Sequence, residues 1–112
     1  MKTLYCLELA RGRYYVGQTP KGRLNRRLWE HDHGGAKWTT RFPPRRLLWS
    51  KPVQDRYADT QEDEENIKIM RKHGRNASRG GTFNICRDIK GMPSWAGPRY
   101  VRFWAEIEEA SL

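Results

Sequence analysis

Residues 3–17 read TLYCLELARGRYYVG, and this stretch constrains how the rest of the chain can be arranged. Residues 3–9 alternate and then run apolar, a pattern typical of a half-buried β-strand. Residues 10–13 include a glycine and have the length of a hairpin turn. Strand-like composition returns over residues 14–16 and stops at Gly17. The chain is therefore expected to begin with an antiparallel β-hairpin.

A helix is expected next, over residues 23–32. Leu24 and Leu28 lie four residues apart and give it an apolar stripe, while Arg27 and His31 have the same spacing on another face. Packing of the apolar stripe on the sheet would leave Arg27 and His31 together along a polar face.

The middle of the chain predicts a loop, a strand and a second helix. Residues 36–46 are basic, and two prolines break any helical or strand period there, so a loop is expected. The apolar residues 47–49 predict a third strand. The second helix is expected to begin at Thr60 as its N-cap and to end before Gly74, with acidic residues in its first turn and basic residues in its last. A loop over residues 76–83 follows.

A last helix is expected from Pro98 onwards. Large apolar residues recur there at i, i+3, i+4 and i+7, namely Tyr100, Phe103, Trp104 and Ile107. Such a stripe is more typical of a core than of an interface. Together the elements predict an α+β fold in one domain over residues 1–112, with a three-stranded antiparallel sheet flanked by helices.

The charge of the chain indicates the class of its partner. Its 112 residues hold 22 Lys and Arg against 13 Asp and Glu, a formal net charge of +9. Residues 1–52 contain 12 basic and 3 acidic side chains, whereas residues 53–112 contain 10 of each. An excess of positive charge that is confined to one half of the chain favours a polyanionic partner. Nucleic acid is favoured over a membrane surface, because the sequence lacks a basic amphipathic helix with a large apolar face.

An intracellular protein, in the cytoplasm or in a host cell, is expected rather than a secreted or membrane-bound one. No apolar run approaches the ~18 residues of a membrane span, and Glu8 interrupts the opening segment before a signal-peptide core can form. Cys6 and Cys86 form neither a CxxC pair nor a Cys/His cluster, which argues against a disulfide scaffold and against structural zinc. Both are expected to be small buried apolar side chains.

Candidate catalytic residues are brought together on one patch by this arrangement. Tyr5 and Tyr15 lie within the hairpin, and the next helix supplies Arg27 and His31. Glu62, on the second helix, is the member of the set that could hold a hard metal ion. Each residue alone also has an ordinary structural explanation, because strand tyrosines pack, surface arginines are solvated and first-turn glutamates interact with the helix dipole.

Five segments in register resemble the GIY-YIG nuclease family. The first four are Leu4-Tyr5-Cys6-Leu7, Tyr15-Val16-Gly17-Gln18-Thr19, Leu24-Asn25-Arg26-Arg27-Leu28-Trp29-Glu30-His31 and Ala36-Lys37-Trp38-Thr39. The fifth runs from Glu62 through Met70-Arg71-Lys72-His73-Gly74 to Arg79-Gly80-Gly81. The resemblance covers residues 3 to about 83, and residues 84–112 form a C-terminal extension that contains the last helix.

The resemblance implies a set of catalytic residues and a cofactor, Mg²⁺ or Mn²⁺. The family has two short sequence triplets, which fall at residues 3–5 and 15–17 here. The set comprises Tyr5 from the first triplet and Tyr15 from the second, the helix arginine Arg27, His31 one turn later, and Glu62 as the metal ligand. Glu64 and Glu65 are neighbouring carboxylates, and the spacing to Met70 favours Glu62 as the ligand. A single carboxylate suits one metal ion.

The sequence departs from the family pattern at three places. The first triplet reads Thr3-Leu4-Tyr5, which lacks the usual Gly and Ile but retains the tyrosine. Val16 replaces isoleucine in the second triplet, a conservative exchange on a strand. The asparagine that often follows the glutamate helix would fall near Ala77, so Asn76 or Asn84 replaces it or it is absent.

The function implied by the resemblance is a divalent-metal-dependent endonuclease that hydrolyses phosphodiester bonds in DNA. Arg27, permanently charged and bidentate, would bind the phosphate and the charge that develops on it. The general base is either Tyr5, whose phenol pKa would have to be lowered, or His31, whose ordinary pKa suits the role better. Tyr15 would position the water or the phosphate.

Contacts with DNA are expected from the basic half, at Arg23, Arg26, Lys37, Trp38, Thr39, Arg41, Arg45 and Arg46. Trp38 would either stack on a base or fill the edge of the core, and the core is favoured. The sequence contains no helix-turn-helix or zinc finger, so recognition of DNA structure, a protein partner or a homodimer is expected to supply specificity.

Two other functions stay open. A non-catalytic nucleic-acid-binding module would keep the basic face without needing Glu62. A domain that binds a protein partner would use the apolar stripe of the last helix, which includes Tyr100 and Trp104.

Overall fold

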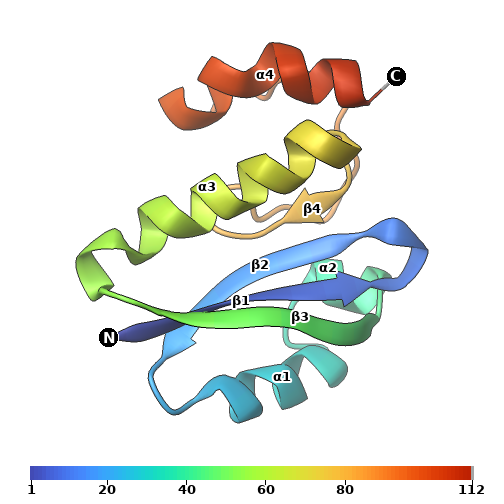
Figure 1. Ribbon diagram of the computed structural model, residues 1–112. Helices are drawn as coiled ribbons and strands as arrows, with labels where there is room; N and C mark the ends of the chain where they lie inside the picture. The colour runs from blue at the N-terminus through green and yellow to red at the C-terminus, as the bar shows by residue number, and fades with distance from the viewer. Residues whose placement is uncertain (112) are drawn as a thin grey trace.

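The computed structural model describes residues 1–111, in which a four-stranded mixed sheet carries helices on both faces (Figure 1). The strands, in the spatial order β3-β1-β2-β4, are β1 (Lys2–Leu9), β2 (Tyr14–Pro20), β3 (Pro44–Val53) and β4 (Ser78–Arg79). The α+β class and the antiparallel β1–β2 hairpin are confirmed. The prediction of a three-stranded antiparallel sheet is wrong, because β4 adds a fourth strand parallel to β2.

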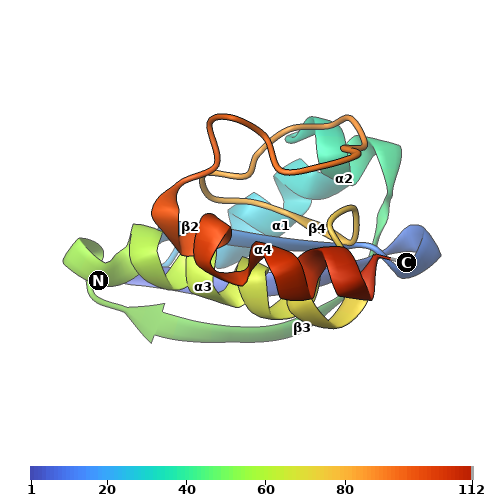
Figure 2. The same cartoon turned by 90° about the horizontal axis from the view of Figure 1, so that it is seen from above.

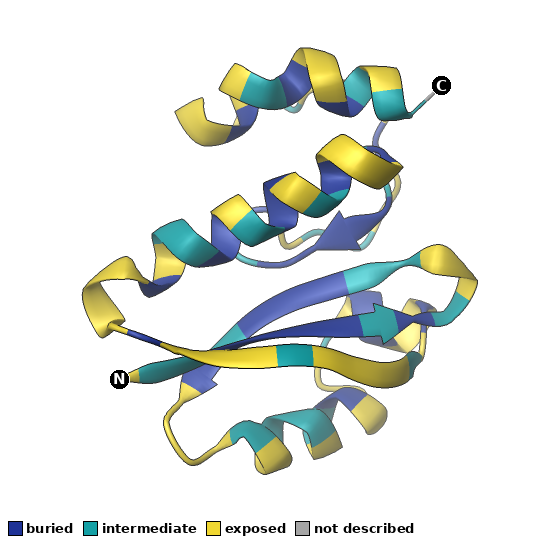
Figure 3. Cartoon of the chain, in the orientation of Figure 1, coloured by how far each residue is buried: buried dark blue, intermediate teal, exposed yellow. Residues whose placement is uncertain are grey.

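Two strands are longer than predicted and a third is new, each for a local reason. β2 continues past Gly17 to Pro20, because β1 offers it pairing partners as far as Lys2. β3 extends beyond residues 47–49 as an edge strand whose side chains are mostly exposed, so apolar residues mark only its middle (Figure 3). β4 is two residues long and lies within the predicted loop 76–83, where no period can be read.

The helices are α1 (Leu24–Asp32), α2 (Lys37–Arg41), α3 (Asp55–His73) and α4 (Pro98–Ala110), and the hairpin contains a 3₁₀ turn, η1 (Ala10–Gly12). α1 and α4 confirm two predicted helices. α2 corrects the predicted loop over residues 36–46, because Trp38 and Phe42 anchor it to the core and both prolines follow its last residue. α3 begins before Thr60, which is therefore not its N-cap. None of the helices described over residues 1–111 is long and apolar enough to cross a membrane.

β1 is a central strand that is buried on both faces. Leu4 and Cys6 pack on the side of α3, whereas Tyr5 and Leu7 pack on the side of α1 and α2. Layers on both sides explain why residues 4–7 are apolar without interruption. Cys6 is buried, as predicted. Cys86 is partly exposed, so the prediction that it is buried is wrong.

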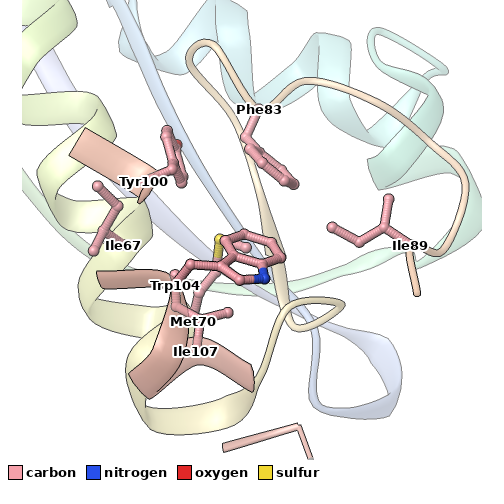
Figure 4. Packing of buried hydrophobic residues seen from close by; sticks show 7 residues of the cluster. All are labelled: Ile67, Met70, Phe83, Ile89, Tyr100, Trp104 and Ile107. Atoms are coloured by element: carbon pink, nitrogen blue, oxygen red, sulfur yellow. The ribbon is translucent and has the colours of Figure 1, made fainter. Parts of the chain in front are cut away.

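A second core, which we call the helical core, lies between α3, α4 and the segment that precedes α4 (Figure 4). Its buried members are Ile67, Met70, Phe83, Ile89, Tyr100, Trp104 and Ile107. The predicted apolar stripe of α4 therefore faces the interior, as the core interpretation expects. Over residues 98–110 the stripe is already covered, so it does not offer the apolar face that a protein-binding domain would need.

The segment between β4 and α4, which lies wholly within the described residues, contains no helix or strand (Figure 2). Buried polar groups fasten it instead. The fully buried Arg79 side chain donates hydrogen bonds to backbone carbonyl oxygens of this segment and lies over the ring of Trp38. Burial lowers the pKa of Arg79 to about 10. Asn76 pairs its amide with the backbone of Ile89, accepting at 2.8 Å and donating at 3.1 Å. The two side chains hold the segment against α2 and α3.

Candidate active site

Tyr5 and Tyr15 share one face of the β1–β2 hairpin and lie side by side in the interior. Their ring centroids are 6.3 Å apart, and the two residues are 0% and 5% exposed. A Cβ on Gly17 would lie 2.5 Å from the Tyr5 hydroxyl oxygen and 2.8 Å from a ring carbon of Tyr15. The glycine of the second triplet is therefore required, because the Tyr5 hydroxyl occupies the space of a side chain there.

His31, from the last turn of α1, forms a buried pair with Tyr5. Its Nε2 atom lies 2.7 Å from the Tyr5 hydroxyl oxygen, and its Nδ1 atom lies 3.0 Å from Oγ1 of Thr39 on α2. Burial, followed by the positive charge of Arg27, lowers the pKa of His31 from 6.5 to about 4. The imidazole is therefore neutral at pH 7.

Arg27 lies one turn earlier on α1, close to the hydroxyl groups of both tyrosines. Burial raises the pKa of each phenol; the charge of Arg27 opposes this rise but does not cancel it. Burial alone would lower the pKa of Arg27, but the two hydroxyl groups beside it raise that pKa overall. Arg27 also pairs with Glu30 at 3.3 Å, and its side chain is 26% exposed. It is the member of the group that faces solvent.

α3 lies on the opposite face of the sheet from α1 (Figure 1), and it carries Glu62, whose carboxylate contacts Gln18 at the edge of β2. β4 pairs with β2 at Tyr14 and Tyr15 alone, so the rest of that edge carries no strand. Across this edge the negative charge of Glu62 raises the pKa of both Tyr5 and Tyr15. We use the name tyrosine pocket for the packed cluster of side chains formed by Tyr5, Tyr15, Arg27, His31 and Thr39, with Glu62 at its edge.

The Glu62 carboxylate is nearly buried and accepts a hydrogen bond at each oxygen. Its Oε2 atom accepts from Nε2 of Gln18 at 2.6 Å, and its Oε1 atom accepts from the backbone N–H of Gly81 at 3.0 Å. The same Gln18 nitrogen donates to Asp59, one turn earlier on α3, at 2.6 Å. Burial raises the pKa of Glu62, and the hydrogen bonds from Gln18 and Gly81 oppose the rise.

A metal ion at Glu62 would find few further side-chain ligands. Within residues 1–111, no group of three or more His, Cys, Asp and Glu side chains is placed to hold one. The carboxylates of Glu62 and Asp59 both accept hydrogen bonds from the side-chain amide nitrogen of Gln18. Their oxygens retain further lone pairs that could bind a metal ion. This donor set fits Mg²⁺, which binds proteins through one or two carboxylates and keeps several waters.

The predicted DNA contacts divide into exposed and buried residues. Those exposed are Arg23, Arg26, Lys37, Arg41, Arg45 and Arg46. Arg41 is also engaged within the protein, where it pairs with Asp88 at 3.1 Å. Trp38 is 1% exposed and donates from Nε1 to a β2 carbonyl oxygen, so the favoured core position is confirmed and its ring is covered. Thr39 is equally buried and contacts His31 instead of the surface.

The two asparagines considered for the site have different surroundings. Asn76 uses its amide to hold the backbone of Ile89, as described above. Asn84 is exposed on the segment before α4. Asn76 is therefore a structural residue.

Sequence reasoning missed Gln18 and Asp59 and assigned Thr39 a different role. Gln18 is the polar side chain that follows the second triplet, and this position is its only signal in the sequence. Asp59 lies three residues before Glu62, the spacing of one helical turn. That relation was hidden because the helix was expected to begin at Thr60.

Comparisons with known proteins gave no match: no family model, no curated protein and no solved structure is significantly similar to this chain. The resemblance to the GIY-YIG family therefore rests on the sequence segments alone.

Proposed function

We propose that this protein is a divalent-metal-dependent endonuclease that hydrolyses DNA phosphodiester bonds, in the manner of the GIY-YIG family that it resembles. The observation that carries the proposal is the tyrosine pocket, where side chains from β1, β2 and α1 converge beside a buried carboxylate. Burial of so many polar and ionisable groups in one place costs stability. Clusters with displaced pKa values occur most often at functional sites.

Arg27 would bind the scissile phosphate. It is charged at all physiological pH values, and it is the most exposed member of the pocket. Its guanidinium matches two phosphate oxygens and stabilises the charge that develops during attack. Tyr5 is fully buried, so a local rearrangement would have to expose its hydroxyl before water could contact it.

Tyr5 and His31 would act as a pair in removing the proton of the attacking water. Both ring nitrogens of His31 are occupied, Nε2 by the Tyr5 hydroxyl and Nδ1 by Thr39, so a proton from water would reach His31 through the Tyr5 hydroxyl. His31 would then hold the proton only briefly before releasing it to solvent, because burial and the charge of Arg27 lower its pKa to about 4. The Tyr15 hydroxyl, near the same arginine, would position the water or the phosphate.

Glu62 would hold Mg²⁺ or Mn²⁺, with Asp59 as a second carboxylate. When bound, such an ion neutralises charge on the phosphate and on the leaving oxygen. Gln18 and Gly81 would orient the Glu62 carboxylate for this task, since each fixes one of its oxygens.

DNA backbone contacts would come from the exposed basic residues Arg23, Arg26, Lys37, Arg45 and Arg46. Phosphate contacts fix position on the DNA without reading its sequence. Specificity would therefore depend on DNA structure, on a protein partner or on a second copy of the chain.

A non-catalytic nucleic-acid-binding module is the second candidate. One observation favours it: both oxygens of Glu62 already accept hydrogen bonds from the protein. Such a module would bind DNA through the same exposed basic residues and leave it intact.

A cleavage assay tests the proposal. The protein is incubated with labelled linear and branched DNA duplexes in Mg²⁺, Mn²⁺ or EDTA, and the cut products are measured. We expect the wild type to cut with either metal and not in EDTA, and we expect Glu62→Gln to lose about 10²-fold or more in rate. Glu64→Gln is the matched control, because this exposed glutamate lies on the same helix, and it should cut like the wild type. Binding without cutting under every condition would contradict the proposal and favour the binding module.

A further inference from the structure

Thr39 occupies a position that the function proposed above does not explain. The residue lies on α2, is 1% exposed, and is joined to the pocket through His31. Its Oγ1 atom lies 3.0 Å from Nδ1 of His31 and 3.1 Å from the carbonyl oxygen of Ala36. The hydroxyl group therefore links the buried imidazole to the backbone at the start of α2.

The proton positions in these hydrogen bonds follow from the donors available. The carbonyl oxygen of Ala36 can only accept, so the contact with it uses the single proton of the Thr39 hydroxyl. Toward His31 the hydroxyl oxygen can then only accept. Nδ1 of the neutral imidazole must carry the ring proton, and Nε2 is left as an acceptor 2.7 Å from the Tyr5 hydroxyl oxygen.

We propose that Thr39 is a positioning residue that fixes the tautomer of His31, so that Nε2 is the acceptor for the proton of Tyr5. In the other tautomer Nε2 would donate to Tyr5, and the pair could not pass a proton inward. The catalytic consequence rests on the proposed function. The tautomer itself does not rest on it: it is inferred from the hydrogen bond that Thr39 donates to Ala36.

During hydrolysis the proton would move along this chain in one direction. The oxygen of the attacking water forms the bond to phosphorus while the bond to the leaving oxygen breaks. One proton of the water passes to the Tyr5 oxygen as the original Tyr5 proton passes to Nε2 of His31. The imidazolium keeps its Nδ1 proton on Thr39, and the leaving oxygen takes a proton from solvent.

Thr40 provides a matched control on the same helix. Its hydroxyl group donates to the same Ala36 carbonyl oxygen at 2.9 Å, and the residue is exposed. Its hydroxyl is bound to the backbone and is not one of the groups bound to the His31 ring, whose partners are Tyr5 and Thr39. Loss of the Thr40 hydroxyl should therefore leave the tautomer unchanged.

The tautomer can be measured by long-range ¹H–¹⁵N correlation NMR on histidine-labelled protein at neutral pH, with His31→Gln to assign the signal. We expect Nδ1 to carry the proton in the wild type, in Thr39→Ser and in Thr40→Val. Thr39→Val, which keeps the side-chain shape, should lose this preference and show the Nε2-protonated form. An Nε2-protonated ring in the wild type, or an unchanged tautomer in Thr39→Val, would overturn the proposal. The wild-type spectrum decides the first point even where Thr39→Val folds poorly.

Cleavage rates separate this proposal from the proposed function. Thr39→Val should cut DNA more slowly by on the order of 10²-fold, mainly in kcat, and Thr39→Ser should restore most of the rate. A rate in Thr39→Val equal to that of the wild type would remove the catalytic role of Thr39. A wild type that cuts no DNA would contradict the proposed function, while the NMR result would still decide the tautomer.

Discussion

The tyrosine pocket and the helical core are both buried and both built around aromatic rings, yet they use those rings in opposite ways. In the helical core, the Tyr100 hydroxyl is satisfied by Asn66 at 3.1 Å and by Asp63 at 3.3 Å, among otherwise apolar neighbours. In the tyrosine pocket two phenols, an imidazole and a guanidinium share one space and displace one another's pKa values. The first region buries one hydrogen-bonded phenol, whose pKa is also raised by burial, within apolar contacts, whereas the second gathers several ionisable groups, which costs stability.

Removal of one buried hydroxyl group from each region gives the largest expected contrast. Tyr5→Phe keeps the ring but takes away the proton donor of His31, so DNA cleavage should fall by about 10²- to 10⁴-fold. Tyr100→Phe should leave the cleavage rate unchanged. Both variants leave buried polar groups without a partner and should lose about 1–3 kcal/mol in free energy of unfolding. Cleavage assays and urea titrations on the pair measure this, and equal loss of activity in both would erase the contrast.

Truncation within the helical core should change stability and leave the chemistry intact. Ile107 is fully buried, so Ile107→Ala should lower the free energy of unfolding by about 3 kcal/mol through lost contacts and a new cavity. Val101→Ala, at a position 47% exposed on the same helix, should cost less than about 0.5 kcal/mol. The cleavage rate per folded molecule should match the wild type in both. A much slower Ile107→Ala at a temperature where it is folded would contradict the separation of the two regions.

His31 should make stability depend on pH. Its pKa falls from 6.5 in the ordinary state to about 4 in the folded protein, so between these values the folded chain binds fewer protons than the unfolded chain. Above pH 6.5, His31 is neutral in both states and does not change the free energy of unfolding. As the pH falls toward 4, the unfolded chain gains a proton that the folded chain does not, so the free energy of unfolding falls by up to about 3 kcal/mol.

Urea titrations at pH 7 and pH 4.5 check this expectation. His31→Gln should be less sensitive to acid than the wild type, because the titrating group is gone. His33→Gln, at an exposed histidine next to the same helix, should behave like the wild type. Identical acid sensitivity of His31→Gln and the wild type would show that the imidazole is not held neutral by the pocket.

The smallest effect is expected outside both regions, at the exposed basic residues. Lys37→Ala should weaken DNA binding by less than about 1 kcal/mol and reduce the slope of log K against log salt by about 1. Lys72→Ala, an exposed lysine near the end of α3, is the control and should keep both values. Fluorescence anisotropy across a salt series measures the difference, and equal slopes for Lys37→Ala and the wild type would remove α2 from the DNA-binding surface.

The parts of the fold that could be predicted are those with strong local patterns. The β1–β2 hairpin, α1 and α4 follow from alternation and from helical spacing, and the predicted stripe on α4 lies in the helical core. α2 could not be predicted, because it is five residues long and gains its stability from Trp38 and Phe42, which pack against distant strands. β4 is too short to show any period, and its pairing with β2 depends on a chain reversal after α3.

The candidate site could be predicted only in part for the same reason. Arg27 and His31 share a helix face, so their proximity follows from spacing. The junction of Glu62 with Gln18 depends on how α3 crosses the edge of β2, which no local pattern encodes. Thr39 reaches His31 only because α2 folds back beside α1.

The central claim is tested most directly by a plasmid assay in Mg²⁺. The assay compares how fast the wild type, Arg27→Ala and Arg56→Ala relax supercoiled plasmid, with DNA binding measured in parallel. Arg56 is an exposed arginine on α3 and serves as the matched control. We expect the wild type and Arg56→Ala to nick the plasmid at similar rates, and Arg27→Ala to bind it and leave it supercoiled. Nicking by Arg27→Ala at the wild-type rate, or binding without nicking by all three proteins, would contradict the assignment of the tyrosine pocket as a nuclease site.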